Sequence, residues 1–370
     1  MTSSKPSKQS PKPHPSPLRS LLATNTPILD VRAEAEFEQG AIPNSINLPI
    51  LNDAERTRVG ITYKQQGQLA AEKVGHRLVS GEIRGGRVDG WKAFCAQDPT
   101  TVITCWRGGR RSQLAQEWLR DAGLDVERVA GGYKSLRQTC LDILANDTLS
   151  KRWLVLAGKT GTAKTVRINQ VQSSIDLEGL ANHRGSAFGN QSTPQPSPAT
   201  FENQLACAFL KLDSPCLIVE DESRTIGRLA IPESWHEQMQ AAPLVLIDES
   251  DEFRITHIER EYVAEPLASG VSSESLRRQY QSALDRIARR LGGKDHKQIT
   301  ILLTEAFLGQ RGHRDWIEDL LRKYYDPMYE FQLKKKQPRV VMSGDHQAVL
   351  AYLSDHGHVG VRDHDHVDAQ

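Results

Sequence analysis

Thr101-Val-Ile-Thr-Cys105-Trp-Arg107-Gly-Gly-Arg110-Arg111-Ser112 is the stretch from which the fold of the N-terminal half can be inferred. A β-branched apolar run leads into a single cysteine, and a short loop with two glycines and three arginines follows it. The next residues carry Leu114, Trp118 and Leu119 on one side, which predicts an amphipathic helix. The pattern therefore predicts a strand, a loop and a helix, with Cys105 at the end of the strand.

Cys105 has the surroundings of a reactive thiol. A helix N-terminus and cationic neighbours favour the thiolate form of a cysteine, which is its nucleophilic form. Glycines allow backbone N–H groups to turn inward around an anion. We therefore predict that Cys105 is catalytic and that Arg107, Gly108, Gly109 and Arg110 bind an anion. The residues alone leave one alternative open, a buried cysteine followed by a basic turn.

Composition limits the class of protein. The 370 residues suggest two domains, and a formal net charge of +1 restricts any nucleic-acid surface to a local patch. Five cysteines without a CxxC pair favour a reducing compartment and argue against disulfides and a metal site. No apolar run approaches the roughly 18 residues of a membrane span. We expect a cytoplasmic protein with a disordered tail at residues 1–17, which are rich in Pro, Ser and Lys.

The segment that we assign to the first domain covers residues 18–145. Short apolar strands alternate there with helical segments, which predicts an α/β domain with a mainly parallel sheet and helices on both faces. We expect a polar loop around Arg84-Gly-Gly-Arg87. Four blocks resemble a rhodanese domain: Leu29-Asp-Val-Arg32, Glu36-Phe-Glu-Gln-Gly-Ala-Ile-Pro-Asn-Ser-Ile-Asn-Leu-Pro49, the Cys105 loop and Gly131-Gly-Tyr133. In that family this cysteine carries a persulfide or perselenide, so the resemblance implies that Cys105 handles a chalcogen.

The second domain, assigned to residues 146–335, opens with Trp153-Leu-Val-Leu-Ala-Gly158-Lys-Thr-Gly161-Thr-Ala-Lys164-Thr165. An apolar strand runs into a phosphate-loop pattern and then a helix, which predicts a P-loop NTPase-like α/β domain. Gly158, Gly161, Lys164 and Thr165 meet the needs of phosphate binding: backbone N–H groups, a reaching lysine and a hydroxyl for Mg²⁺. Ala163 stands where the usual motif has glycine, so we do not expect efficient nucleotide hydrolysis. A chance strand, turn and helix is the alternative.

Two strands that end in acidic residues follow. Glu220 and Asp221 end the first and are candidates for the Mg²⁺ side of the phosphate loop. Asp248 and Glu249 end the second and compete for that role, so we expect one pair to be structural. The polar block at 174–189 is by its spacing alone a solvated loop.

The C-terminal part of the second domain is predicted to be helical. Leu276, Tyr280, Leu284, Ile287 and Leu291 mark one face of a long helix. Residues 336–370 are predicted to be a C-terminal tail. Its His-Gly-His and His-Asp-His pairs at 356–358 and 364–366 fit a ragged tail better than a metal site.

The order of several blocks along the chain resembles one family, the tRNA 2-selenouridine synthases. The resemblance covers about residues 18–331 and rests, besides the Cys105 loop and the Gly131 block, on Tyr63-Lys-Gln-Gln-Gly67, Gly75-His-Arg-Leu-Val79, Asp176-Leu-Glu-Gly-Leu-Ala-Asn-His-Arg-Gly-Ser-Ala-Phe-Gly189, Glu220-Asp-Glu-Ser-Arg-Thr-Ile-Gly227 and Tyr324-Tyr-Asp-Pro327. It implies exchange of sulfur for selenium at the wobble 2-thiouridine of tRNA, with selenophosphate as donor. Members are also described as forming S-geranyl-2-thiouridine from geranyl diphosphate.

The resemblance also divides the roles between the domains. The phosphate loop would hold the diphosphate of geranyl diphosphate, and the Cys105 loop would hold selenophosphate or its selenium. Candidate contacts to substrate or tRNA are Arg77, His183, Arg184 and Arg224, with Arg84, Arg87 and Lys92 as further phosphate contacts. We expect no tightly bound cofactor, with Mg²⁺ as a candidate ion, and a selenophosphate-supplying enzyme as a candidate partner.

Two other functions remain open at this point. One is a rhodanese-type sulfurtransferase fused to a nucleotide-dependent kinase, which would turn over thiosulfate and bind ATP without tRNA. The other is a non-catalytic redox-sensing or RNA-binding module in which Cys105 is inert and Ala163 marks a decayed loop.

Overall fold

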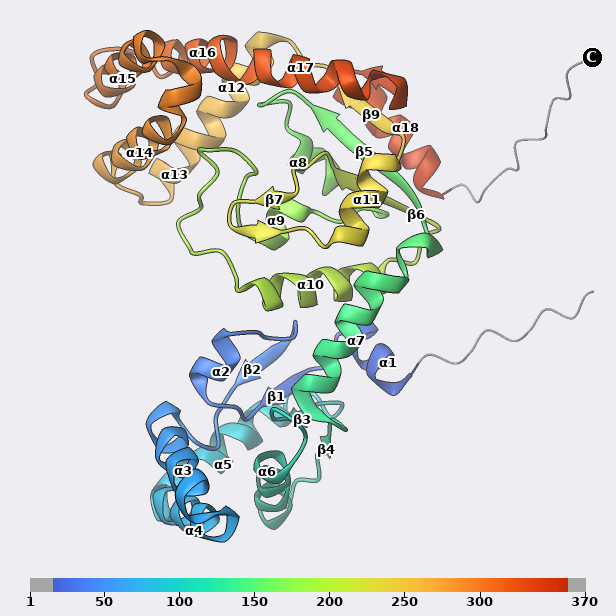
Figure 1. Cartoon of the computed structure of the whole chain (residues 1–370), viewed down its shortest axis with the longest axis vertical. Helices are drawn as coiled ribbons and strands as arrows, with labels where there is room; N and C mark the ends of the chain where they lie inside the picture. Colours follow the sequence, from blue (N-terminus) through green and yellow to red (C-terminus); the bar gives the residue numbers. More distant parts are fainter. Residues whose placement is uncertain (1–15, 359–370) are drawn as a thin grey trace, which may run out of the picture. The chain divides into compact units, whose positions relative to one another are not determined.

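The computed structural model describes residues 16–358 and divides into two compact units, Met1–Thr139 and Cys140–Gln370. Each unit is built around its own four-stranded parallel sheet (Figure 1). The division falls within one helix, α7 (Gly132–Asn146), which ends the first unit and begins the second. Within residues 16–358, no helix has the length and apolar character needed to cross a membrane.

The first unit has the sheet order β2-β1-β3-β4. Its elements are α1 (Pro17–Ala23), β1 (Ile28–Asp30), α2 (Glu34–Glu38), β2 (Ser45–Asn47), α3 (Asp53–Gln66), α4 (Gln68–Leu78), α5 (Gly81–Cys95), β3 (Val102–Thr104), α6 (Arg110–Asp121) and β4 (Glu127–Arg128). The two central strands, β1 and β3, pair in parallel with Asp30 opposite Thr104. Parallel strands end at the same edge, so Cys105 lies at the carboxyl edge of the sheet, where ligands of such folds bind.

The predicted loop around Arg84–Arg87 is wrong, because these residues lie inside helix α5. Val88, Trp91 and Cys95 are buried at helical spacing on one face of α5, and Trp91 donates from Nε1 to the Leu48 carbonyl at 2.9 Å. Glycine disfavours helix by up to about 1 kcal/mol per residue, but the burial of this apolar face outweighs that cost.

The second unit contains the second parallel sheet, in the order β10-β9-β5-β6. Its first elements are a 3₁₀ turn (Thr148–Ser150), β5 (Arg152–Gly158), α8 (Lys164–Ile168), α9 (Leu177–Ala181), α10 (Pro198–Lys211), β6 (Cys216–Glu220), an antiparallel pair β7 (Thr225–Ile226) and β8 (Leu229–Ala230), α11 (Glu233–Ala241) and β9 (Leu244–Ile247). Strands β5 and β6 are almost wholly buried, as the apolar runs predicted. Both β5 and β6 direct their carboxyl ends toward the phosphate loop.

A helical part completes the second unit (Figure 1). It consists of α12 (Asp251–Glu259), a π-helical turn (Arg260–Ala264), α13 (Glu265–Ala268), α14 (Ser273–Leu291), α15 (Gly293–Phe307), α16 (Arg314–Leu320), a second π-helical turn (Leu321–Tyr325) and α17 (Asp326–Lys336). The predicted face of α14 is confirmed, since all five of its named apolar residues are buried in one cluster with Phe188, Trp316 and Tyr325.

The prediction of a tail from residue 336 is wrong for the residues that follow it up to 358. After a 3₁₀ turn (Gln337–Arg339), β10 (Val340–Gly344) pairs in parallel with β9, and α18 (His346–His358) buries Val349 and Leu353 against the sheet. Within residues 346–356, only these two are fully buried, which is too weak an apolar pattern to indicate a helix from sequence. The His pair at 364–366 lies outside the described residues.

Candidate functional site

The Cys105 loop joins the end of β3 to the start of α6. Cys105 is 3% exposed, and its Sγ lies 3.2 Å from the Ser112 Oγ in the first turn of α6. The Gly109 carbonyl is 4.0 Å from the same sulfur. The thiol thus sits below the first turn of a twelve-residue helix, where unpaired N–H groups and the helix dipole favour negative charge. Ser112, which the sequence analysis did not assign a role, is the nearest side chain to the sulfur in hydrogen-bond reach.

Residues 131–134, at the start of α7, hold the backbone of the Cys105 loop in place. The N–H groups of Tyr133 and Lys134 donate to the carbonyls of Cys105 and Trp106 at 2.8 and 2.9 Å. Gly132 adopts φ +61°, and a Cβ there would overlap the Cys105 carbonyl and the Gly108 nitrogen. This close approach explains why the Gly131-Gly132 pair accompanies the cysteine loop in the sequence.

The arginines of the loop have different surroundings. Arg107 is exposed, and it has no ion-pair partner among residues 16–358. Arg110 lies 3.5 Å from Glu72 and 3.6 Å from Glu117, and Arg111 pairs with Glu36. Arg107 is therefore the cation best placed to receive an anion, whereas Arg110 would have to share its charge with two carboxylates.

The phosphate loop joins β5 to α8. Gly161 has φ +89°, and a Cβ there would meet the Arg254 carbonyl at 2.9 Å. The Lys164 Nζ donates to the Gly158 carbonyl at 3.0 Å, so the lysine lies folded across its own loop. Ala163 adopts the left-handed conformation with φ 58°, which explains why the usual motif has glycine at this position.

Carboxyl groups surround Thr165. Its Oγ1 lies 2.7 Å from Glu178 Oε2 and 2.8 Å from Glu220 Oε1. One hydroxyl proton serves only one acceptor, so the second contact requires a proton on a carboxyl group. Burial, followed by the charges of neighbouring carboxylates, raises the pKa of Glu220 well above its ordinary value. Burial and Glu178 raise the pKa of Glu222 to about 8, against the effect of Lys164.

The two acidic strand ends have separate roles in the structure. Glu220 is fully buried and faces Thr165, while Asp221 forms an ion pair with Lys336 at 2.7 Å. At the end of β9, Glu249 accepts hydrogen bonds from the backbone N–H and Nδ1 of His346 at 3.0 and 2.7 Å. Glu249 therefore anchors α18, and Glu220 is the acid beside the phosphate loop. Glu178 and Glu222, which sequence reasoning quoted only within longer blocks, complete that acidic group.

A cavity of about 450 Å³ opens beside the phosphate loop. Arg184 lines it, with Nε 2.6 Å from Glu261 Oε1 and its guanidinium 4.8 Å from the centre of the Tyr262 ring. His183 is buried next to it, and burial lowers the pKa of its imidazole. Arg224 pairs instead with Glu233 at the surface, and it does not line this cavity. The polar block that spacing alone would leave as a solvated loop is thus part of the site.

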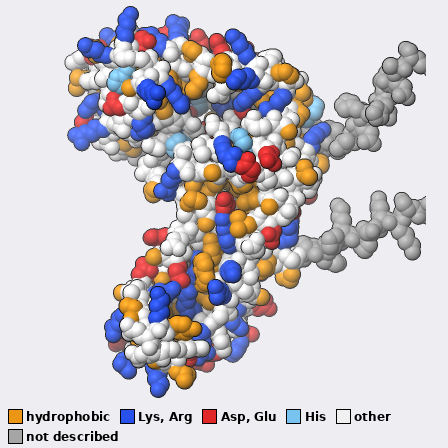
Figure 2. Space-filling model, viewed as in Figure 1, with side chains coloured by type: hydrophobic (Ala, Val, Ile, Leu, Met, Phe, Trp, Pro, Cys, Tyr) orange, Lys and Arg blue, Asp and Glu red, His pale blue; other side chains and the backbone are white. Residues whose placement is uncertain are grey.

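The remaining basic candidates lie on the first unit. Arg77 is exposed on α4 with no ion-pair partner in the described part of the chain. Arg84 pairs with Asp121 at 3.3 Å, and Arg87 pairs with Glu55 at 2.7 Å. Figure 2 shows Lys and Arg side chains interspersed with Asp and Glu over both units, in keeping with the balanced composition. Of these three arginines, Arg77 is the freest to contact an external anion.

These two loops define an α/β protein that joins a rhodanese-type cysteine loop to a phosphate-loop domain. Comparisons with known proteins agree. The family model of the rhodanese-like domain matches residues 14–139, and that of the tRNA 2-selenouridine synthase AAA domain matches residues 151–359. The tRNA 2-selenouridine synthase of Shewanella pealeana is 43% identical over 91% of this chain and 97% of its own. Those of Marinobacter nauticus and Azotobacter vinelandii are each 43% identical over 90% of this chain and 95% of theirs. The chain belongs to the tRNA 2-selenouridine synthase family.

Proposed function

We propose that this protein converts wobble 2-thiouridine in tRNA to 2-selenouridine through S-geranyl-2-thiouridine. The family membership supports the overall reaction. The observation that carries the division of labour is that one chain contains two different anion loops, one beside a thiol and one beside a lysine and carboxyl groups. Two chemically different steps need two such loops.

We assign the geranyl step to the phosphate loop. The 2-thiouridine sulfur forms a bond to C1 of geranyl diphosphate, the C1–O bond breaks, and diphosphate leaves while the uridine gives up its N3 proton. Gly158, Gly161, Lys164 and Thr165 would hold the diphosphate. Thr165 and Glu220 supply oxygen ligands of the kind that Mg²⁺ prefers, and phosphate oxygens and water would complete its coordination.

The residues around Thr165 fit such an ion only in part. No three side chains of His, Cys, Asp or Glu in residues 16–358 form a ready metal site. The contact of Thr165 with two carboxyl groups, one of which must carry a proton, nevertheless indicates a position where a cation would relieve the crowding of acids. Mg²⁺ would therefore arrive with the diphosphate rather than before it.

We assign the selenium step to the Cys105 loop. Selenium of selenophosphate forms a bond to C2 of the geranylated base, the C2–S bond breaks, and geranylthiol leaves with a proton. Water then cleaves the Se–P bond and releases phosphate. Arg107 and the backbone of Gly108 and Gly109 would hold the selenophosphate oxygens, and the thiol of Cys105 would supply the proton that the leaving geranylthiol takes up.

The tRNA would be held by cations outside the two loops. Arg77 on the first unit is exposed, and Arg184 lines the cavity beside the phosphate loop although it pairs with Glu261. We rank these two above Arg224, which pairs with Glu233 and does not line that cavity. None of the five cysteines forms a disulfide, which suits the reducing cytoplasm where tRNA is modified. An enzyme that makes selenophosphate would be the natural partner.

The test separates the steps by mutation. Anticodon stem-loop RNA with 2-thiouridine is incubated with the full-length protein, geranyl diphosphate and selenophosphate, and its nucleosides are identified by mass spectrometry. We expect Cys105→Ala to accumulate S-geranyl-2-thiouridine without selenium. We expect Lys164→Ala to leave 2-thiouridine unmodified but to convert RNA that is already geranylated. Full selenium incorporation by Cys105→Ala, or unchanged geranyl transfer by Lys164→Ala, would contradict the assignment.

A further inference from the structure

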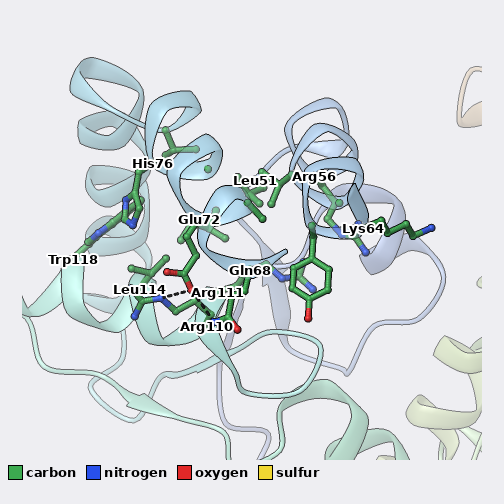
Figure 3. Close-up of a pocket in the computed structure, with 17 residues that line it drawn as sticks. Leu51, Arg56, Lys64, Gln68, Glu72, His76, Arg110, Arg111, Leu114 and Trp118 are labelled. Atoms are coloured by element: carbon green, nitrogen blue, oxygen red, sulfur yellow. Dashed lines mark hydrogen bonds and ion pairs between the residues drawn. The ribbon is translucent and has the colours of Figure 1, made fainter. Parts of the chain in front are cut away.

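A pocket of about 500 Å³ lies within the first unit (Figure 3). Helices α3, α4 and α6 form its walls. Its apolar lining comes mainly from Leu51, Val59, Ala71, Val79, Leu114 and Trp118. The volume falls in the range of about 300–1,000 Å³ that is typical of small-molecule sites.

Small residues create this pocket. Ala71 and Gly75 are four residues apart on α4, and Gly60 lies on α3, so all three face the space between the helices. A Cβ added at Gly75 would meet only Val59 Cγ2, at 3.8 Å. Larger side chains at these positions would close the space, as they do in an ordinary helix contact.

The pocket borders the helix that follows the Cys105 loop, because Arg110 and Arg111 of α6 line it. Arg110, Leu114 and Trp118 follow one another along one stripe of α6, and Arg110 is the first residue of that helix after the loop. Cys105 belongs to the same buried cluster as the wall residues Leu51, Val79 and Trp118. A ligand in the apolar pocket at the start of α6 would therefore lie next to the segment that carries the thiol loop.

Cations stand at the opening. Figure 3 shows Arg56 and Lys64 on one side, with Arg110 and Arg111 below. Arg56 and Arg111 both form ion pairs with Glu36. Arg110 forms ion pairs with Glu72 and Glu117. Lys64 is exposed and has no ion-pair partner among the residues that the structure describes. An apolar interior with a cationic edge suits an apolar group carried on a polyanion.

We propose that this pocket binds the geranyl chain of S-geranyl-2-thiouridine while the base is presented to the Cys105 loop. The proposal rests on the proposed function, because it requires a geranylated base as intermediate. The cavity at the phosphate loop has more polar than apolar lining surface, although Val166, Ile287 and Met328 also line it. The pocket in the first unit offers a ten-carbon chain a mainly apolar lining, and the edge cations face the RNA backbone. Holding the chain there orients the C2–S bond toward the selenium donor.

The experiment compares two RNAs on the full-length protein. Anticodon stem-loops with S-geranyl-2-thiouridine or with 2-thiouridine are titrated by fluorescence anisotropy. We expect the wild-type protein to prefer the geranylated RNA by at least about tenfold, because the free energy of burial grows with every carbon removed from water. Gly75→Leu, whose Cβ has room beside Val59 and whose remaining atoms would extend into the pocket, should reduce the preference to about twofold or less while leaving the affinity for the 2-thiouridine RNA unchanged.

Two further variants guard the conclusion. Leu114→Asn places an amide in the wall and should reduce the preference in the same way. Ala70→Leu adds a similar bulk on α4 outside the pocket and should leave the preference as in the wild type. Equal affinity of the wild type for both RNAs, or a full preference in both Gly75→Leu and Leu114→Asn, would overturn the proposal.

The kinetics of the two steps distinguish this proposal from a pocket that binds geranyl diphosphate and from a failure of the proposed function. If Gly75→Leu raises the KM for geranyl diphosphate in the first step and leaves the RNA preference intact, the pocket serves the donor and the proposal fails. If wild-type protein makes neither geranylated nor selenated RNA, the proposed function itself fails. Selenation of pre-geranylated RNA that slows in both pocket variants, with normal geranyl transfer, supports the proposal.

Discussion

The two anion loops of this protein share a backbone plan and differ in their charges. Each follows a parallel strand, turns through a glycine with positive φ and enters a helix. The Cys105 loop presents Arg107 without a carboxylate partner in the described residues. At the phosphate loop, Glu178 and Glu220 contact Thr165 directly, and the pKa of Glu222 is raised to about 8. We propose that the same backbone device serves two different kinds of ligand.

The difference teaches how each loop recognises its anion. A loop with arginine and backbone N–H groups alone binds a bare oxyanion. A loop crowded by acids repels a bare oxyanion and accepts one that arrives with a cation. The contrast predicts that only one half of the reaction depends on Mg²⁺.

The largest expected effect is therefore that of metal removal. EDTA should slow geranyl transfer by at least about 100-fold, since a metal ion at a leaving diphosphate contributes several kcal/mol. Selenation of pre-geranylated RNA should change less than about twofold under the same conditions, because the positive charge of Arg107 neutralises the selenophosphate oxygens without a metal ion. The rates of both steps are measured on the same protein with EDTA and again after Mg²⁺ is added back. Only the rate of geranyl transfer should fall and then recover. An equal loss in both steps would remove the contrast between the loops.

The next effect concerns the backbone of the Cys105 loop. Gly132→Ala should lower the free energy of unfolding by roughly 3 kcal/mol, since a Cβ at φ +61° also overlaps the backbone of Cys105 and Gly108. Urea unfolding followed by tryptophan fluorescence measures this. Gly109→Ala is the matched control, because Gly109 has φ −91° and an added Cβ meets nothing within 4 Å. Equal stability of the two variants would show that the close approach of Gly132 to the backbone of Cys105 and Gly108 does not contribute to stability.

The third effect tests the acids of the phosphate loop by pH. An acid whose pKa is raised on folding binds more protons in the folded state, so stability falls as pH rises from its unfolded pKa of about 4.5 to its folded value. Glu222→Gln removes this loss. In EDTA it should stabilise the protein by on the order of 1 kcal/mol at pH 8 and by almost nothing at pH 4.5, the value being reduced because the side chain is partly exposed.

Thermal unfolding at the two pH values measures that difference. Glu233→Gln is the control, because that carboxylate is exposed and paired with Arg224, so its pKa is lowered rather than raised. A stabilisation by Glu222→Gln that is equal at pH 4.5 and pH 8 would show that the raised pKa of Glu222 is not the cause.

Local sequence patterns predicted the loops well because each loop depends on neighbouring residues. Strand, glycines and cation follow one another within a dozen positions in both cases. The family model and relatives confirm the rhodanese and phosphate-loop assignments. The residues that complete each site come from distant segments. Glu178 reaches Thr165 across 13 positions and Glu220 across 55, and local periodicity carries no information about such contacts.

The two wrong predictions also arise from contacts between distant segments, which here override the local sequence preference. Gly85 and Gly86 indicate a loop by their own preference, but Trp91 and its neighbours bury the helix that contains them. The segment after Lys336 is predicted to be a tail, but its residues 340–344 form strand β10, which pairs with β9. Tertiary contacts decided both segments, and neither contact is visible in the local sequence.

The smallest expected effect lies at Ala163 and concerns the phosphate loop alone. Its φ of 58° costs a residue with a Cβ on the order of 1 kcal/mol, and glycine would avoid that cost while gaining freedom in the unfolded chain. Ala163→Gly should therefore change the free energy of unfolding by less than about 1 kcal/mol in either direction. Ala163 is 8% exposed and lines the cavity, so removal of its methyl group should also leave the affinity for diphosphate within about threefold. Isothermal titration with Mg²⁺-diphosphate measures this. A much larger gain in affinity would mean that the methyl group, and not the acids beside Thr165, limits anion binding at this loop.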